Sequence, residues 1–100
     1  MKATIQELEG KYVATLEGEL DTAAAEEVEQ VLKPLYKSDG KDVIIDCSNL
    51  EYIASSGLRI LLSILKGANA KGSRVLMRSV NDDIKNVFQL TGLISYFEFE

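Results

Sequence analysis

The hydroxyl groups of Ser55 and Ser56 and the thiol of Cys47 are the side chains of this sequence that come closest to nucleophilic chemistry. Such a nucleophile needs an adjacent base, and histidine is the residue that most often acts as one. The 100 residues include no histidine, which excludes Ser-His and Cys-His pairs and imidazole as a metal ligand. P-loop, GxGxxG and EF-hand spacings are also missing. We therefore predict a protein that is not an enzyme, with no catalytic residue, cofactor or metal, although a metal site of Asp and Glu alone stays open.

The two serines stand where a helix is expected to begin. The first residues of a helix have backbone N–H groups without intrahelical partners, at the positive end of the helix dipole. A helix that begins at Ser55-Ser56-Gly57 therefore accommodates an anion such as a phosphoryl group. The alternative interpretation is structural, because serine is a favoured N-cap and Gly57 allows tight packing. Cys47 is most simply a small buried apolar residue.

Charge and composition limit the classes of partner and the compartment. The formal net charge is -5 and the lysines and arginines are scattered along the chain, which argues against nucleic acid or an anionic membrane as the main partner. A single cysteine gives no sign of an oxidising compartment. No apolar run approaches the roughly 20 residues of a membrane span, and the N-terminal segment lacks the apolar core of a signal peptide. We expect a cytoplasmic protein that does not insert into a membrane.

Apolar periodicity predicts the elements that position these serines. Alternating residues on both sides of Gly10 predict a β-hairpin. The short apolar run Val43-Ile44-Ile45 predicts a strand buried on both faces, and residues 74–77 and 95–99 predict two more strands. Helices are predicted near residues 22–37, 56–70 and 82–91, with Asp21 or Thr22 and Asn81 as caps, Pro34 in the last turn or at a kink, and Gly92 as a stop.

The order of these elements is β-β-α-β-α-β-α-β. Strands that alternate with helices imply mainly parallel pairing, here joined to one antiparallel hairpin. The length suits one domain, and no linker, repeat or low-complexity segment divides it. We therefore predict a single α/β domain over residues 1–100, with a mixed sheet and three main helices.

Three motifs, in register with these elements, resemble the signature of the STAS domain family. Residues 46–58, DCSNLEYIASSGL, resemble its buried strand, loop and D-S-S-G-L helix start. Gly18-Glu19-Leu20-Asp21 resembles its G-x-L-D turn, and Thr91-Gly92-Leu93 resembles its S/T-G-L ending of the third helix. The resemblance covers the whole chain. It implies a STAS fold and a bacterial anti-sigma factor antagonist, which regulates transcription by partner switching.

The resemblance also assigns a phosphorylation site and partners. In antagonists of this family, a partner anti-sigma factor that is also a serine kinase phosphorylates the first serine of the S-S-G unit, which is Ser55 here. The dephosphorylated protein binds the anti-sigma factor and frees the sigma factor, and a serine phosphatase resets the switch. The chain departs from the family pattern at Ala54, where many members carry Asp.

A partner-binding surface is expected around Ser55, at the start of the second helix. Ile60 and Ile64 lie outside the apolar stripe that begins at Leu58, which suggests a docking ridge; the alternative is burial under a neighbouring helix. For Asp21 and Asp46, the alternatives to a functional role are helix capping and loop hydrogen bonding. Tyr52 and Ile53 are expected to anchor the loop against the core. The predicted partner-binding residues are Asp21, Ser55, Ser56, Gly57, Arg59, Ile60 and Ile64.

Two other functions compete with the phosphorylation switch. The first is a constitutive STAS subunit that docks on the ATPase of an ABC-type lipid transport complex without covalent switching, which Ala54 favours. The second is an enzyme, which intrinsic nucleotide hydrolysis would reveal. Gene neighbourhood distinguishes the phosphorylation switch from the docking subunit. A small kinase gene beside this gene supports the switch, and genes for transporter subunits support the docking subunit.

Overall fold

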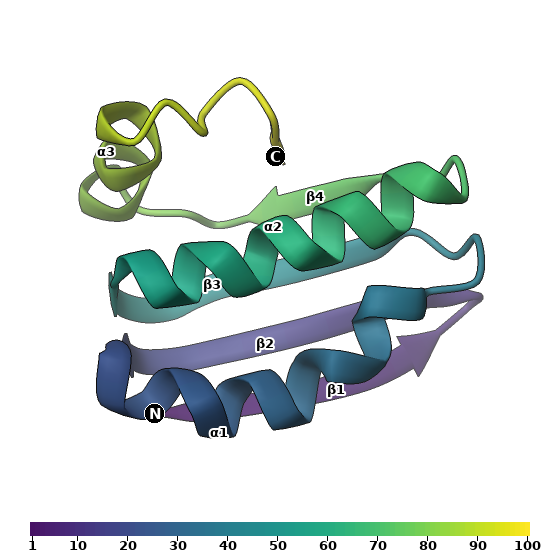
Figure 1. The fold of residues 1–100 in the computed structure, drawn as a ribbon, viewed down its shortest axis with the longest axis horizontal. Coiled ribbons are helices and arrows are strands. Elements are labelled where there is room, and N and C mark those ends of the chain that lie inside the picture. The colour runs from purple at the N-terminus through teal and green to yellow at the C-terminus, as the bar shows by residue number, and fades with distance from the viewer.

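The computed structural model describes all residues 1–100 and contains a mixed five-stranded sheet, of which Figure 1 labels β1 to β4. The strands lie in the order β1-β2-β3-β4-β5; β1 and β2 are antiparallel, and the other neighbouring pairs are parallel. This arrangement confirms the predicted α/β class, the hairpin and the order of elements. The elements are β1 (Lys2–Leu8), β2 (Lys11–Leu20), α1 (Thr22–Leu32), the 3-10 helix η1 (Lys33–Lys37), β3 (Val43–Ile53), α2 (Ser55–Ala70), β4 (Val75–Arg78), α3 (Asp82–Leu90) and β5 (Glu98–Phe99).

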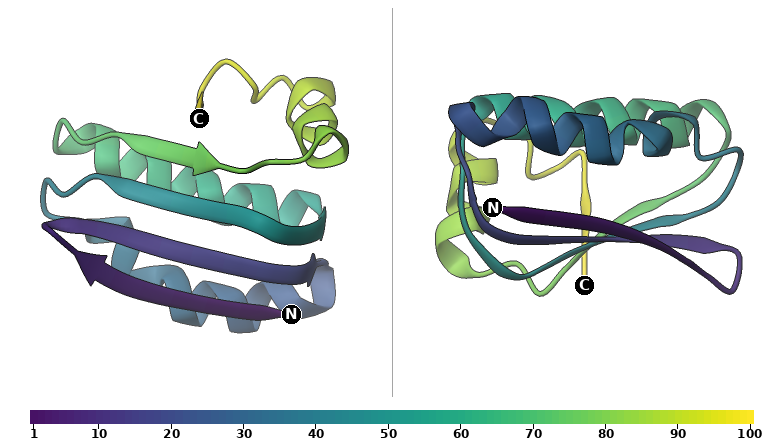
Figure 2. Two further views of the ribbon diagram at one scale, coloured as in Figure 1. Left: turned by 180° about the vertical axis from the view of Figure 1, so that it is seen from behind. Right: turned by 90° about the horizontal axis from the view of Figure 1, so that it is seen from below.

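Helices α1 and α2 cover one face of the sheet and lie side by side on it (Figure 2). The core fills the space between these helices and the sheet, where Leu16 of β2, Ile45 of β3 and Met77 of β4 are fully buried. Helix α3 closes the β4 side, where Phe88 packs edge to face against Phe97 and Phe99 with ring centroids 5.3 and 5.5 Å apart. None of the helices combines the length and the apolar character needed to cross a membrane.

The predicted turn and cap residues act where the sequence places them. Glu9 and Gly10 both have positive φ, 53° and 77°, as a two-residue hairpin turn requires. The Asp21 carboxylate accepts a 2.9 Å hydrogen bond from the Ala24 N–H and caps α1. Asn81 caps α3 in the same way, through a 2.8 Å bond from the Ile84 N–H. Pro34 lies at the start of η1, so the chain tightens there instead of continuing as an α-helix.

Three strand boundaries differ from the prediction. Strand β3 runs on to Ile53 through the segment predicted as a loop, because Cys47, Leu50 and Ile53 continue to bury their side chains. Strand β2 likewise extends to Leu20, so most of the predicted G-x-L-D turn is strand. Strand β5 has only two residues, since β4 pairs with it only at Leu76 and Met77.

Candidate functional site

The candidate site lies where β2 and β3 end side by side and α2 begins. The Ala54 N–H donates a 2.8 Å hydrogen bond to the Leu20 carbonyl, which ties the start of α2 to the end of β2. Ala54 is the N-cap and has no side chain that can accept a hydrogen bond from the helix. The helix starts at Ser55, as predicted, but neither serine is its cap. The N–H groups of the first turn are therefore left without intrahelical or side-chain acceptors.

The two serines differ in accessibility. Ser55 is exposed at the first position of α2. Ser56 is half-buried, and its Oγ atom is completely buried without a hydrogen-bond partner. Only the Ser55 hydroxyl is therefore open to a reagent or a partner from solvent.

Gly57 is a packing residue and is not part of the surface. A Cβ atom added at this position would lie 2.7 Å from Cγ of Leu20 and 2.9 Å from Cγ1 of Ile53. The absence of a side chain lets α2 approach the ends of β2 and β3 closely. The prediction that Gly57 contacts a partner is wrong, because the residue is buried.

Ile60 and Ile64 also belong to the core. They are 4% and 0% exposed and pack in the same cluster as Leu61 and Leu65. Helix α2 contacts α1 and η1 as well as the sheet, so its apolar arc is wide enough for two sets of neighbours. The docking ridge predicted from Ile60 and Ile64 is therefore wrong, and their burial under neighbouring helices explains the pattern.

The remaining predicted residues, Asp21 and Arg59, each line a surface hollow. A groove of about 290 Å³ between α1 and α2 is lined in part by Ser56 and Arg59. A second hollow of about 470 Å³ is lined by residues from the start of α1 and the ends of β2 and β3, and by Asp21. Six carboxylates and one cationic side chain, that of Arg59, line the two hollows; the carboxylates are Glu19, Asp21, Glu26, Glu27, Glu29 and Glu51.

Tyr52 lies on the surface of this region, so the prediction that it anchors a loop against the core is wrong. It is 47% exposed and pairs with Glu19 across β2 and β3, although it was expected to anchor a loop. Ile53, the next residue, is 2% exposed and does pack against the core. Recognising that the strand continues to Ile53 would have placed Tyr52 on the surface.

Asp46 and Cys47 have structural roles within β3. The Asp46 carboxylate accepts hydrogen bonds from the hydroxyl and the N–H of Ser48, which lower the pKa of Asp46. Burial raises the pKa of the Cys47 thiol to about 12, with a smaller contribution from the charge of Asp46. A buried thiol that stays protonated is not a nucleophile, which agrees with Cys47 as an apolar core residue.

Comparisons with known proteins identify relatives of the whole fold. A family model described as "STAS domain" matches residues 2–100. The anti-sigma-B factor antagonist of Staphylococcus aureus is 32% identical over 82 residues, which are 82% of this chain and 76% of that protein. A crystal structure of an anti-sigma factor antagonist from Mycobacterium paratuberculosis superposes with a TM-score of 0.80 at 26% identity, over 98% of this chain and 83% of that one.

The anti-sigma factor antagonist SpoIIAA of Bacillus has been solved in two covalent states that both share this fold. The TM-scores are 0.80 for its unphosphorylated form and 0.74 for its phosphorylated form, at 21% identity. The superpositions cover 99% of this chain and 88% and 91% of the two SpoIIAA chains.

Proposed function

Because this chain belongs to the STAS domain family, we propose that it is a cytoplasmic anti-sigma factor antagonist that a kinase switches off by phosphorylating Ser55. The unphosphorylated chain binds an anti-sigma factor with the surface around the start of α2 and thereby frees a sigma factor. The names of the relatives support the antagonist function. The observation that carries the switch is the contrast between the exposed Ser55 hydroxyl and the buried Ser56 hydroxyl.

The docking surface of this proposal is defined by the exposed and half-buried residues Asp21, Tyr52, Ser55 and Arg59. They come from the ends of β2 and β3 and from the first two turns of α2. These segments lie together because the Ala54 N–H is hydrogen-bonded to the Leu20 carbonyl. This arrangement offers a partner one aromatic side chain, one cation, one carboxylate and one hydroxyl group. Aromatic and arginine side chains are the residues that most often dominate binding energy at protein interfaces.

Phosphorylation would use Ser55 only as an acceptor. Its hydroxyl oxygen forms a bond to the γ-phosphorus of ATP held by the kinase, the bond from that phosphorus to ADP breaks, and the hydroxyl proton leaves to a base of the kinase or to water. The first turn of α2 tolerates the product, because its N–H groups have no other acceptor. The phosphoryl group adds about -1.5 to -2 charge to the middle of the docking surface. A phosphatase that hydrolyses the ester restores binding.

The kinase assay is the experiment that tests this site. We expect one phosphoryl group on the wild-type chain after incubation with the cognate kinase and ATP, none on Ser55→Ala, and one on Ser56→Ala. Mass spectrometry of the intact chains and their peptides measures all three. Ser56→Ala is the matched control, because it removes a neighbouring hydroxyl that is buried. Phosphate on Ser56, or on Ser55→Ala at an undiminished level, would contradict the proposal.

A second candidate function rests on Ala54. Many family members carry an acidic residue there, and the alanine leaves α2 without a side-chain cap. A constitutive docking subunit of an ABC-type lipid transport complex needs no kinase to read this position. If no residue of the wild-type chain is phosphorylated and binding to an ATPase subunit is found, this second function replaces the first.

A further inference from the structure

The surroundings of Ser55 are strongly acidic, which is a problem for a group that is to carry a phosphate. Glu26 and Glu29 line the groove that Ser56 and Arg59 also line, four more carboxylates, Asp21 among them, line the second hollow, and the whole chain has a net charge of -5. Like charges this close oppose the dianion and raise its pKa. A cation within reach of Ser55 would offset this repulsion, and Arg59 is the cationic side chain that lines the groove between α1 and α2.

Arg59 is placed to reach Ser55. The two residues are four positions apart on α2, so they are neighbours on one face of the helix, about one turn from each other. Both residues are exposed. The acidic partner would stand N-terminal to the basic one, which is the favourable orientation for an ion pair of this spacing.

Arg59 is also the arginine of this chain that is free to take a new partner. The chain has three arginines, and the other two are paired, Arg74 with Glu98 at 2.9 Å and Arg78 with Glu100 at 3.1 Å. Arg59 forms no ion pair, although Glu26 and Glu29 line the same groove. Its planar guanidinium suits a phosphate, because two N–H groups can bind two phosphate oxygens together.

We propose that Arg59 binds the phosphate of phosphorylated Ser55 within the same chain. This inference rests on the phosphorylation site of the proposed function. It also gives the switch a second physical component, because the ion pair removes Arg59 from the docking surface at the moment when the phosphate adds negative charge to it. Phosphorylation then withdraws a cation from the partner in addition to adding an anion.

The phosphate pKa measures this contact directly. A phosphoserine has a second pKa of about 6, and a nearby cation lowers it by favouring the dianion. We expect Arg59→Gln to raise the phosphate pKa by about 0.3, the shift that corresponds to one exposed ion pair at this spacing. The pKa is read from a ³¹P NMR titration of the full chain with phosphoserine incorporated at position 55 by genetic code expansion. No kinase is needed.

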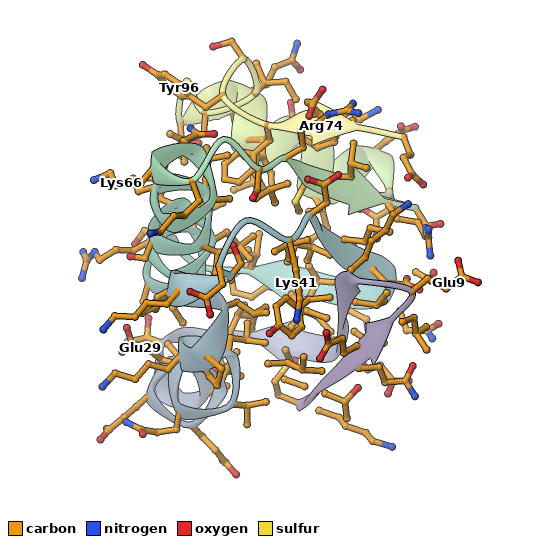
Figure 3. The ribbon with its side chains drawn as sticks, turned by 90° about the vertical axis from the view of Figure 1, so that its right-hand side faces the viewer. Glu9, Glu29, Lys41, Lys66, Arg74 and Tyr96 are labelled. Atoms are coloured by element: carbon orange, nitrogen blue, oxygen red, sulfur yellow. The ribbon has the colours of Figure 1, made fainter.

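Two variants of the same phosphorylated chain separate a specific contact from a general field. Lys66→Gln removes the same charge from α2, but Lys66 lies eleven residues beyond Ser55, about 16 Å along the helix, and extends into solvent (Figure 3). We expect it to leave the phosphate pKa unchanged. Arg59→Lys keeps the charge without the planar fork and is expected to restore part of the shift.

We expect the highest phosphate pKa for Arg59→Gln, the wild-type value for Lys66→Gln, and a value between these two for Arg59→Lys. A wild-type pKa equal to that of Arg59→Gln, or equal shifts for Arg59→Gln and Lys66→Gln, would overturn the inference. Such a result leaves the proposed function intact, because kinase modification and partner binding are measured separately. Conversely, failure of the kinase assay does not affect the titration, since the phosphoserine is incorporated during synthesis.

Discussion

Substituting Ile64 by glutamate is expected to destabilise the domain by about 4 kcal/mol or more, a large part of the roughly 5–15 kcal/mol by which domains are stable. Ile64 is 0% exposed and packs where α2 meets its neighbouring helices, so the new carboxylate would be buried without a partner or would force the helices apart. Urea unfolding followed by circular dichroism measures the loss.

The control is Lys66→Glu, which places the same side chain two residues further along α2 at an exposed position. It should change the free energy of unfolding by no more than about 0.5 kcal/mol. An Ile64→Glu variant with an unfolding midpoint near that of wild type would return Ile64 to the surface and revive the docking ridge predicted from the sequence.

Replacing Ser55 by aspartate is expected to weaken binding of the anti-sigma factor by about 2 kcal/mol, roughly thirtyfold in Kd. The exposed side chain stands in the docking surface, where a partner would bury the new charge without a compensating group or be held away by it. Isothermal titration calorimetry, with the purified partner titrated into each variant, measures the change in Kd.

Ser55→Asn is the matched control for this change, because asparagine has the size of aspartate without its charge. Ser55→Asn and Ser55→Ala should bind within about threefold of wild type, a difference of less than about 0.7 kcal/mol. Equal losses for the aspartate and asparagine variants would assign the effect to size. An aspartate variant that binds as tightly as wild type would remove charge at this position as the basis of the switch.

Helices α1 and α3 were predictable because each has local signals at both ends. Asp21 and Asn81 are strong N-caps, Pro34 interrupts the first helix and Gly92 follows the third, so the positions of α1 and α3 follow from neighbouring residues alone. The mainly parallel pairing of the sheet was predictable, since strands that alternate with helices are joined by crossover connections.

The strand ends were not predictable from local pattern. The pairing of β2 with β3 shifts register between Thr15 and Glu17 and again between Gly18 and Glu19, and such irregularities break the alternation of inward and outward side chains. The length of β3, and with it the exposure of Tyr52, depends on this pairing. A strand partner that lies far away in sequence leaves no local signature.

The site was predicted in part. The motif placed Ser55 correctly at the start of α2, but it could not show that Ser56 and Gly57 are turned inward. The apolar period of α2 likewise does not distinguish a docking ridge at Ile60 and Ile64 from contact with a second set of neighbours. Gly67 marks that second contact, because an added Cβ would lie 2.1 Å from the Tyr36 carbonyl oxygen, and nothing near Gly67 in the sequence indicates it.

A sigma-release assay tests the proposed function most directly. The anti-sigma factor and sigma factor from the same genome are assembled with a fluorescent label on the sigma factor, and the chain is titrated in with or without phosphoserine at position 55. We expect the unmodified chain to release the sigma factor, and the phosphorylated chain to need at least a thirtyfold higher concentration, the effect of about 2 kcal/mol. Failure of the unmodified chain to bind the anti-sigma factor and release the sigma factor, at concentrations where the complex is otherwise stable, would contradict the account.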